Sequence, residues 1–181
     1  MKQSISLFAV LVLFSISVSA QNIFTAIKEN DAPAVKFLLS KGADLDTKDA
    51  NGATPLINAV KGGNERIIIA LLQKNPSVDV KDNAGNTALL VACQNNLTQA
   101  MYLLASHFPD VSLRNNNGQT ALMAAVNTGN ADAVDYLLNH GADKNEKDNQ
   151  NKSAFDYAED LNNNEILGLL KTSSATATHS K

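Results

Sequence analysis

The side chains able to do acid–base, nucleophilic or metal chemistry are few and widely separated in this chain. The histidines are His107, His140 and His179, and the one cysteine is Cys93. None of them stands in the His, Cys and carboxylate spacing that binds a metal ion. No nucleophile elbow and no glycine-rich phosphate loop is present. The sequence therefore predicts a protein that is not an enzyme and that uses no cofactor and no metal.

A column of cations recurs every 33 residues along the chain. Its members are Lys48, Lys81, Arg114 and Lys147. Such a column could form an electrostatic stripe for an acidic partner. Because aspartates at positions 49, 82 and 148 directly follow three of the cations, we favour local neutralisation by these aspartates. Arg114 alone is followed by a neutral residue, so it is the best candidate for an uncompensated contact charge.

The aspartates of this column also admit two interpretations. A row of carboxylates could bind a cation. Alternatively, an Asp or Asn followed three residues later by Gly makes a tight turn, because Gly takes positive φ and the Asp or Asn side chain bonds its own backbone. The turn pattern is present at residues 49–52, 82–85 and 115–118. We therefore interpret the aspartates as structural.

The same 33-residue spacing runs through uncharged residues, which indicates a stack of identical supersecondary units. It relates Leu56, Leu89 and Leu122; Gly52, Gly85 and Gly118; Thr54, Thr87 and Thr120; and Ala59, Ala92 and Ala125. A stack has no natural pocket, so we expect a surface that grips another macromolecule. Cys93 takes the position of Val60 and Val126, which predicts a buried core residue rather than a redox thiol.

Each unit carries signals for a pair of helices. The repeated threonines are predicted N-caps of the first helix, with Pro55 at a first position where its missing N–H costs nothing. Leu56, Ala59 and Val60 follow at helical spacing and face the core. Residues that tolerate left-handed backbone are predicted to end the first helix at Asn30, Gly63, Asn96, Gly129 and Asn162.

These repeated residues resemble the ankyrin repeat, whose signature is D-x-x-G-x-T-P-L-H-x-A followed by a second helix ending in Leu-Leu and Gly-Ala-Asp. The match includes Asp49 to Leu56, Leu137-Leu138 and Gly141-Ala142-Asp143. The resemblance implies an all-α solenoid of helix-turn-helix units with β-hairpin loops, about five ankyrin repeats including degenerate N- and C-terminal caps. The expected repeats are residues 21–48, 49–81, 82–114, 115–147 and 148–171.

The chain departs from the family pattern in two places. Ile57, Leu90 and Met123 replace the His of the signature, which trades a side-chain hydrogen bond for apolar contact. At the end of the second helix, Asn75-Pro76 and Phe108-Pro109 replace Gly-Ala. Proline disfavours the α conformation of the residue before it, so we expect these helices to end because of the proline. Phe108 places an aromatic ring where glycine is expected. We favour a ring that covers the adjacent loop over an exposed anchor for a partner.

The first 20 residues predict a cleaved secretory signal. Lys2 precedes an apolar run from Ile5 to Val18, and Val18-Ser19-Ala20 is a small-x-small cleavage site. The run is shorter than the roughly 20 residues that cross a bilayer. We expect cleavage after Ala20, an ankyrin-repeat domain over residues 21–171 and a disordered tail over residues 172–181. The protein would be exported, periplasmic or secreted, without stable membrane insertion.

The charge balance argues against nucleic acid as the partner. The chain has 15 Lys and Arg against 18 Asp and Glu, a net charge of −3, and loss of Lys2 with the signal would leave −4. Nucleic-acid binders usually show a concentrated basic excess. We expect a monomeric module that binds an unidentified protein, similar to small Sec-exported bacterial ankyrin proteins. The alternatives are an immunity or inhibitor protein that blocks a toxin or hydrolase, and a membrane-tethered scaffold with an uncleaved anchor.

The family resemblance also implies where a partner would bind. In ankyrin proteins the binding surface is usually the hairpin tips and the concave, exposed side of the first helices. Here that strip is dominated by amides and small residues and has few of the aromatic side chains that concentrate binding energy. The candidate partner-binding residues are Asn51, Lys61, Lys81, Asn83, Asn86, Gln94, Asn95, Phe108, Arg114, Asn116, Asn117, Gln119, Asn127 and Lys147.

Overall fold

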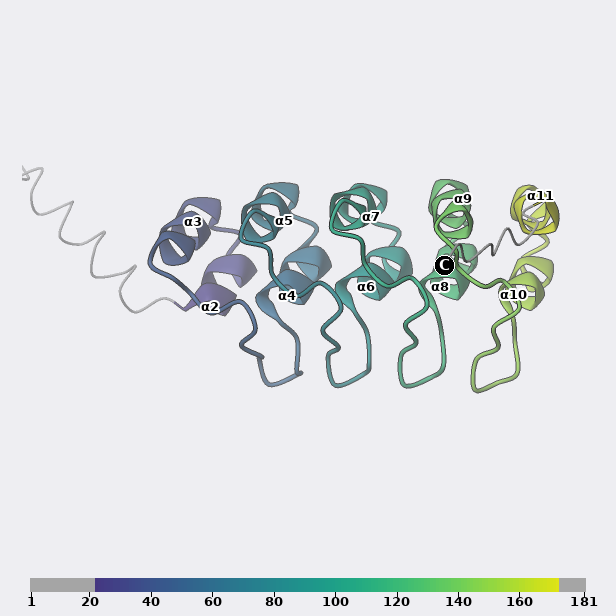
Figure 1. The fold of residues 1–181 in the computed structure, drawn as a ribbon, viewed down its shortest axis with the longest axis horizontal. Coiled ribbons are helices and arrows are strands. Elements are labelled where there is room, and N and C mark those ends of the chain that lie inside the picture. Colours follow the sequence, from purple (N-terminus) through teal and green to yellow (C-terminus); the bar gives the residue numbers. More distant parts are fainter. Residues whose placement is uncertain (1–21, 173–181) are drawn as a thin grey trace, which may run out of the picture.

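Paired helices stack side by side in the computed structural model, which describes residues 22–172. The first helix of each pair belongs to one row and the second helix to a parallel row, with the connecting loops projecting beyond the first row (Figure 1). This arrangement confirms the predicted all-α solenoid. The predicted signal, residues 1–20, and positions 173–181 of the predicted tail lie outside the described residues.

The inner row consists of the first helices of the repeats. They are α2 (Ile23–Lys28), α4 (Pro55–Gly62), α6 (Ala88–Gln94), α8 (Ala121–Asn127) and α10 (Ala154–Asp160). The predicted N-caps Thr54, Thr87 and Thr120 are confirmed, because each hydroxyl accepts the backbone N–H three residues on at 3.3 Å. Ser153 caps α10 and shares a reciprocal capping box with Asp156.

The outer row consists of the second helices. They are α3 (Ala32–Ser40), α5 (Glu65–Leu72), α7 (Thr98–Ala105), α9 (Ala131–Asn139) and α11 (Asn164–Thr172). The side chains of Asp31, Asn64 and Asn130 cap three of these helices. The predicted start of the tail at residue 172 is wrong by one position, because Thr172 ends α11 and its hydroxyl donates to the Gly168 carbonyl at 3.0 Å.

The turn between the two helices of each repeat has the predicted left-handed residue. The φ angles are 59° at Asn30, 65° at Gly63, 55° at Asn96, 70° at Gly129 and 52° at Asn162. These values confirm that Asn and Gly end the inner helices. An abrupt end is needed because the outer helix must return antiparallel and pack on its own inner helix.

Small apolar residues hold the inner helices against each other. The alanines at 59, 92, 125 and 158 are at most 1% exposed, and each inner helix packs on the next one along the stack. Ile57, Leu90 and Met123, which replace the histidine of the signature, are each 1% exposed, so apolar contact does take its place. The consequence is a continuous core that no single repeat could form alone.

Cys93 is a core residue, as its repeat position predicts. Its side chain is buried at 2% exposure, and no second described cysteine accompanies it. Burial raises the pKa of the Cys93 thiol to about 12. The thiol is therefore protonated at neutral pH and is a poor nucleophile.

The loops between repeats are hairpins with turns rather than extended strands. Within residues 22–172, strand-type pairing is limited to an isolated antiparallel bridge between Arg114 and Thr120. Each loop instead closes by a backbone bond across its base, such as that from the Asp82 N–H to the Asn86 carbonyl at 3.0 Å. A helix of sufficient length and apolarity to span a bilayer is lacking in the described part of the chain.

Two separate features require glycine in the hairpins: a left-handed backbone and the close approach of the next hairpin. Gly85 has a φ of 80°, which side-chain-bearing residues rarely adopt, and a Cβ added to it would lie 2.7 Å from the backbone nitrogen of Asn116 in the next hairpin. Gly42 has a similar φ of 81° but no atom within 4 Å of an added Cβ. The two positions therefore share the backbone strain and differ in the close approach of the neighbouring repeat.

We predict that Gly85→Ala lowers the free energy of unfolding at least twice as much as Gly42→Ala. Gly42→Ala should cost about 1 kcal/mol from the left-handed conformation alone, whereas Gly85→Ala must also push Asn116 and its hairpin away. Urea unfolding of the two variants measures both costs. Equal losses would show that the approach of successive hairpins is not tight.

Candidate partner-binding surface

A polar side chain closes the base of each hairpin. Asp82 Oδ1 accepts the N–H groups of Ala84 and Asn86 at 3.0 and 2.9 Å. The same pair of bonds recurs at positions 49, 115 and 148. This confirms the turn interpretation of the column. Residues 22–172 also contain no group of three or more His, Cys, Asp or Glu placed to hold a metal ion.

The second carboxylate oxygen of each hairpin aspartate needs a donor of its own. The residue nine positions on supplies it in two repeats: the Asn58 amide donates to Asp49 at 2.9 Å, and the Tyr157 hydroxyl donates to Asp148 at 2.6 Å. In the repeat of Asp82 the equivalent residue is Val91, which has no donor.

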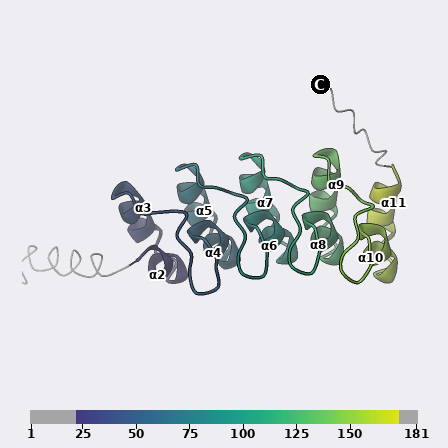
Figure 2. The ribbon, with the colours of Figure 1, turned by 60° about the horizontal axis from the view of Figure 1, so that its bottom comes forward.

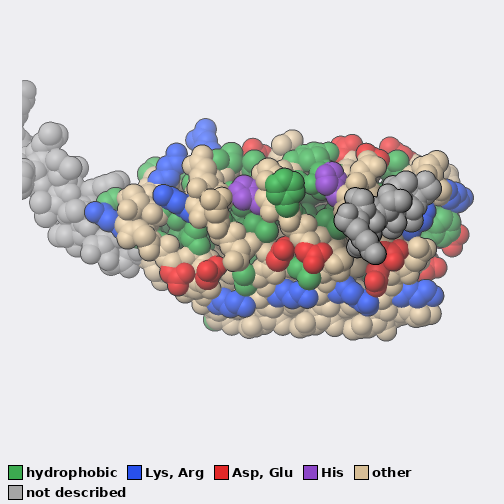
Figure 3. Space-filling model, in the orientation of Figure 1, with side chains coloured by type: hydrophobic (Ala, Val, Ile, Leu, Met, Phe, Trp, Pro, Cys, Tyr) green, Lys and Arg blue, Asp and Glu red, His purple; other side chains and the backbone are tan. Residues whose placement is uncertain are grey.

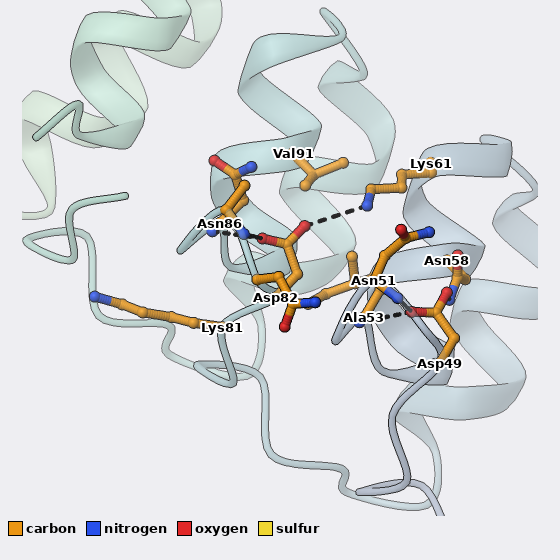
Figure 4. A network of polar contacts seen from close by, with 12 residues as sticks. Asp49, Asn51, Ala53, Asn58, Lys61, Lys81, Asp82, Asn86 and Val91 are labelled. Carbon is orange, nitrogen blue, oxygen red and sulfur yellow. Dashed lines mark hydrogen bonds and ion pairs between the residues drawn. The ribbon is translucent and has the colours of Figure 1, made fainter. Parts of the chain in front are cut away.

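Lys61 supplies that missing donor from the preceding repeat. Its ammonium lies 3.2 Å from Asp82 Oδ2, and the Asp82 side chain is only 5% exposed (Figure 4). In the following repeat the residue nine positions on is Ala124, and there the aspartate itself is replaced by Asn115. A negative charge thus stands at the base of a hairpin only where a donor faces it.

Hydrogen bonds keep Asp49 and Asp148 charged. Burial would raise the pKa of Asp49, but the bonds from the Asn58 amide and from two backbone N–H groups outweigh it and hold the pKa below its usual value. Burial opposes ionisation of Asp148 as well, and there the Tyr157 hydroxyl, with two backbone N–H groups, lowers the pKa. Both groups are therefore carboxylates at neutral pH.

Successive hairpin tips are bonded to each other. The tip asparagines Asn83, Asn116 and Asn149 each donate a backbone N–H to a carbonyl of the preceding tip, at 2.9, 3.0 and 3.0 Å. Their side-chain amides donate to a second carbonyl of that tip at 3.3, 2.9 and 2.9 Å. Asn83 and Asn116, predicted as partner contacts, therefore also hold the stack together.

The cation column forms another set of bonds between repeats. The Lys48 ammonium donates to the carbonyl of Lys81 at 2.9 Å, and the Lys81 ammonium donates to the carbonyl of Arg114 at 2.8 Å. Arg114 continues the series to the carbonyl of Lys147. Neutralisation of each cation by the following aspartate is wrong, because those carboxylates face the interior of their own hairpins.

Arg114 is not the uncompensated charge that its neutral neighbour suggests. Its guanidinium lies 3.0 Å from the Glu146 carboxylate and also donates to the carbonyl of Gly118 at 3.0 Å. The expectation of an unpaired charge is therefore wrong, because the compensating acid comes from the next repeat. Contact of Arg114 and Lys147 with a partner stays a prediction.

Several amides of the predicted strip already have hydrogen-bond partners. Asn86 Oδ1 accepts from Gln94 at 3.1 Å and from Asn115 at 3.0 Å. Gln119 donates to the Tyr157 hydroxyl at 3.4 Å, and Asn95 donates to its own helix at 2.9 Å. The predicted contact residues Asn86, Gln94, Asn95 and Gln119 are therefore all bonded within the fold.

Three predicted contact residues keep free side chains. Asn51, Asn117 and Asn127 are exposed, and their side-chain amides make no hydrogen bond with any residue in the range 22–172. Asn51 and Asn117 lie on hairpin tips, and Asn127 ends α8. These amides remain able to bond a partner.

Phe108 does not cover the adjacent loop. Its ring is 91% exposed, and its φ is 51°. The interpretation that we favoured from the sequence is therefore wrong, because the left-handed backbone at the end of α7 turns the side chain away from the protein. The exposed position fits the alternative, an anchor for a partner, which stays a prediction.

The two described histidines make structural contacts. His107 Nε2 lies 3.1 Å from the carbonyl of Leu72 in the preceding repeat. The His140 ring stacks on Tyr136 with a centroid distance of 3.8 Å, and its Nδ1 lies 2.7 Å from the Tyr136 carbonyl. These contacts give both rings a role within the fold.

Several repeated polar residues predicted to contact a partner have a structural role, and the sequence carries a signal for that role. Asn83, Asn116 and Asn149 recur at the same spacing as the hairpin glycines. A polar residue that recurs in successive units is expected to serve the repeat, by the same logic that marks the repeated Thr as a cap. A residue whose type differs from its equivalents in the other repeats, such as Phe108, is not one that the stack requires.

Comparison with known families agrees with this geometry. A model described as ankyrin repeats (3 copies) matches residues 23–115, and a second, described as ankyrin repeats (many copies), matches residues 104–158. This chain belongs to the ankyrin-repeat family. Ankyrin repeats are generally non-enzymatic modules for protein–protein interaction. A search of curated proteins gave no match to this ankyrin-repeat protein.

The Lys61–Asp82 pair offers a test of how the ankyrin hairpins are stabilised. We predict that Lys61→Met lowers the free energy of unfolding by about 1–2 kcal/mol, because it leaves a carboxylate oxygen of Asp82 buried without a donor. Adding Asp82→Asn should restore most of the loss, since Asn115 already closes a hairpin without a charge. Urea unfolding measures both variants. A double variant no more stable than Lys61→Met would contradict the proposed pairing.

Proposed function

We propose that this ankyrin-repeat protein is exported and binds a protein partner through its hairpin tips and the adjacent face of the inner helices. This surface and this compartment go beyond the general role of the family. It involves no catalysis and no cofactor.

The observation that carries the proposal is the row of exposed hairpin tips held in register. The tips project side by side beyond the inner helices in two views (Figures 1 and 2). Backbone bonds of 2.9 to 3.0 Å join each tip to the preceding one. A surface that is already ordered loses little conformational entropy on binding, so even weakly hydrophobic contacts can give useful affinity.

The chemistry of this row suits a polar protein surface. Ala50 and Ala84 are small, and the free amides of Asn51 and Asn117 can each donate and accept hydrogen bonds. Small residues let a partner's backbone approach the row closely. The tips are therefore suited to bonding exposed backbone and polar side chains of a partner.

Export is supported by the sequence of the N-terminal segment. Lys2, the apolar run and the small residues at 18 and 20 have the order of a secretory signal. A domain that emerges unfolded through an export channel must fold without disulfides here, because Cys93 is the one cysteine. The core and the bonds between repeats provide the stability that disulfides give to many exported domains.

We predict that Asn117→Arg weakens partner binding at least tenfold without changing the unfolding free energy by more than about 0.5 kcal/mol. The new side chain would stand at the centre of the tip row, whereas the amide that it replaces makes no bond within the fold. Capture of partners from envelope extract by the exported protein, followed by titration of the captured partner, measures the effect.

Gln99→Arg is the matched control. Gln99 is also exposed, but it lies on the outer helix α7, away from the tips. It should bind as the unmodified protein does. Equal binding by all three proteins would remove the tip row from the interface.

Export has a separate test. We predict that the protein recovered from the envelope or the medium of the producing cell begins at Gln21, which intact-mass spectrometry determines directly. Cleavage removes the apolar segment and releases the ankyrin domain. A mature N-terminus at Met1 would instead favour a membrane-tethered scaffold.

A further inference from the structure

The left-handed backbone at position 108 recurs in the other repeats, but phenylalanine is an unusual residue to adopt it. The equivalent positions of other repeats are Gly42, Asn75 and Gly141, with φ angles of 81°, 50° and 88°. These residue types tolerate a left-handed backbone, whereas phenylalanine does so at a cost in strain. Since the ring is 91% exposed, it recovers none of that cost through burial. The stability of the stack therefore does not account for this residue.

The loop that carries the ring is fixed to the preceding repeat. His107 contacts the carbonyl of Leu72 at 3.1 Å, and the Asp110 N–H donates to the Asp79 carboxylate at 3.1 Å. The Phe108 N–H also bonds the carbonyl of Ala105 at 3.1 Å. The ring is thus presented from an ordered base, which lowers the entropy lost when a partner covers it.

Further aromatic side chains lie on the neighbouring outer helices. Tyr102 on α7 is 43% exposed and meets Tyr136 on α9 edge to face at 5.9 Å, and Tyr136 stacks on His140. Figure 3 shows hydrophobic side chains between the two described histidines on this side of the molecule. Tyr102, Tyr136 and His140 thus form an aromatic cluster across two repeats, and Phe108 adds an exposed ring in the loop that follows α7. Aromatic side chains of this kind concentrate binding energy.

Unpaired carboxylates lie beside these aromatic side chains. Asp79, Asp110 and Asp143 belong to the loops that follow α5, α7 and α9, and no ion pair within the described residues involves them. Acidic side chains lie below the hydrophobic ones in Figure 3, with a basic row beneath them. The nearby Lys81 and Lys144 ammonium groups donate to the carbonyls of Arg114 and Leu170, at 2.8 and 2.6 Å. Asp79, Asp110 and Asp143 are all exposed, so a partner can reach their carboxylates, and the charge of Lys81 also acts on Asp110.

We infer that this side of the protein binds a cationic protein segment that places an apolar side chain on Phe108. We call it the Phe108 surface, and it comprises Asp79, Tyr102, Phe108, Asp110, Tyr136, His140 and Asp143. The aromatic rings bury the apolar side chain, and the carboxylates attract lysine or arginine on either side of it. Arginine also stacks on exposed aromatic faces.

Charge decides against a second copy as the occupant. In a twofold dimer the same patch meets itself, so the carboxylates of the two copies would lie close together. Like charges across an interface oppose association. The inference rests on the proposed protein-binding function but concerns a surface separate from the hairpin tips, so a failure at Phe108 leaves the Asn117 test unaffected.

The test is binding of a fluorescein-labelled peptide that alternates arginine with leucine, measured by anisotropy with the full chain. We expect binding that weakens at least tenfold in Phe108→Gly. The same variant should raise Tm by about 2–4 °C, because it releases the left-handed strain. A ring with a structural role would instead lower Tm when removed. Asp79→Asn combined with Asp110→Asn, which keeps the loop acceptors, should weaken binding and reduce its salt dependence.

Phe37→Ala is the matched control, since Phe37 is an exposed aromatic on α3 and 46% accessible. It should bind the peptide as the unmodified protein does. Peptides that alternate glutamate with leucine, or arginine with glycine, should bind at least tenfold more weakly. Absence of binding by the arginine–leucine peptide, or equal binding by Phe108→Gly, would overturn the inference. A dimer in sedimentation that Phe108→Gly abolishes would identify a second copy as the occupant and overturn it too.

Discussion

The stacking of one repeat on the next is the interaction on which the rest of the structure depends. A helix pair exposes an apolar face on each side, and alanine at 59, 92, 125 and 158 lets neighbouring inner helices approach until those faces are buried. No repeat can do this alone, because its own two helices cover only part of that surface. Stability therefore comes from interfaces between repeats, and every change that alters their spacing affects the whole stack.

Close stacking also means that the backbone groups of the hairpins need hydrogen-bond partners. It brings successive hairpins together, so their backbone groups must bond across the repeats or lose their hydrogen bonds. The tip asparagines and the cation column meet this requirement with bonds to carbonyls of the adjacent repeat. The pair of Lys61 and Asp82 shows the same principle at a buried charge. Repeated polar residues in this protein thus serve the stack first.

Two kinds of surface remain after these internal bonds are made. The hairpin tips form an ordered polar row with few apolar contacts, whereas the Phe108 surface combines exposed rings with unpaired carboxylates. The two surfaces differ in chemistry and lie on different elements, inner-row loops in one case and the ends of the outer helices in the other. The two proposed binding surfaces share no residue, so a partner on one would leave the residues of the other uncovered.

The sequence by itself determined the repeat, the helix caps, the left-handed turns and the burial of Cys93, because these depend on local conformation and on a period of 33 residues. It did not determine which polar side chains remain free. Arg114 meets Glu146 only when neighbouring repeats stack, and Val91 makes Asp82 depend on Lys61 from another repeat. The exposure of Phe108 likewise follows from the direction of its loop. Tertiary structure decided these points, because the two ion pairs join groups that meet only across a repeat interface and the exposure of Phe108 depends on what surrounds its loop.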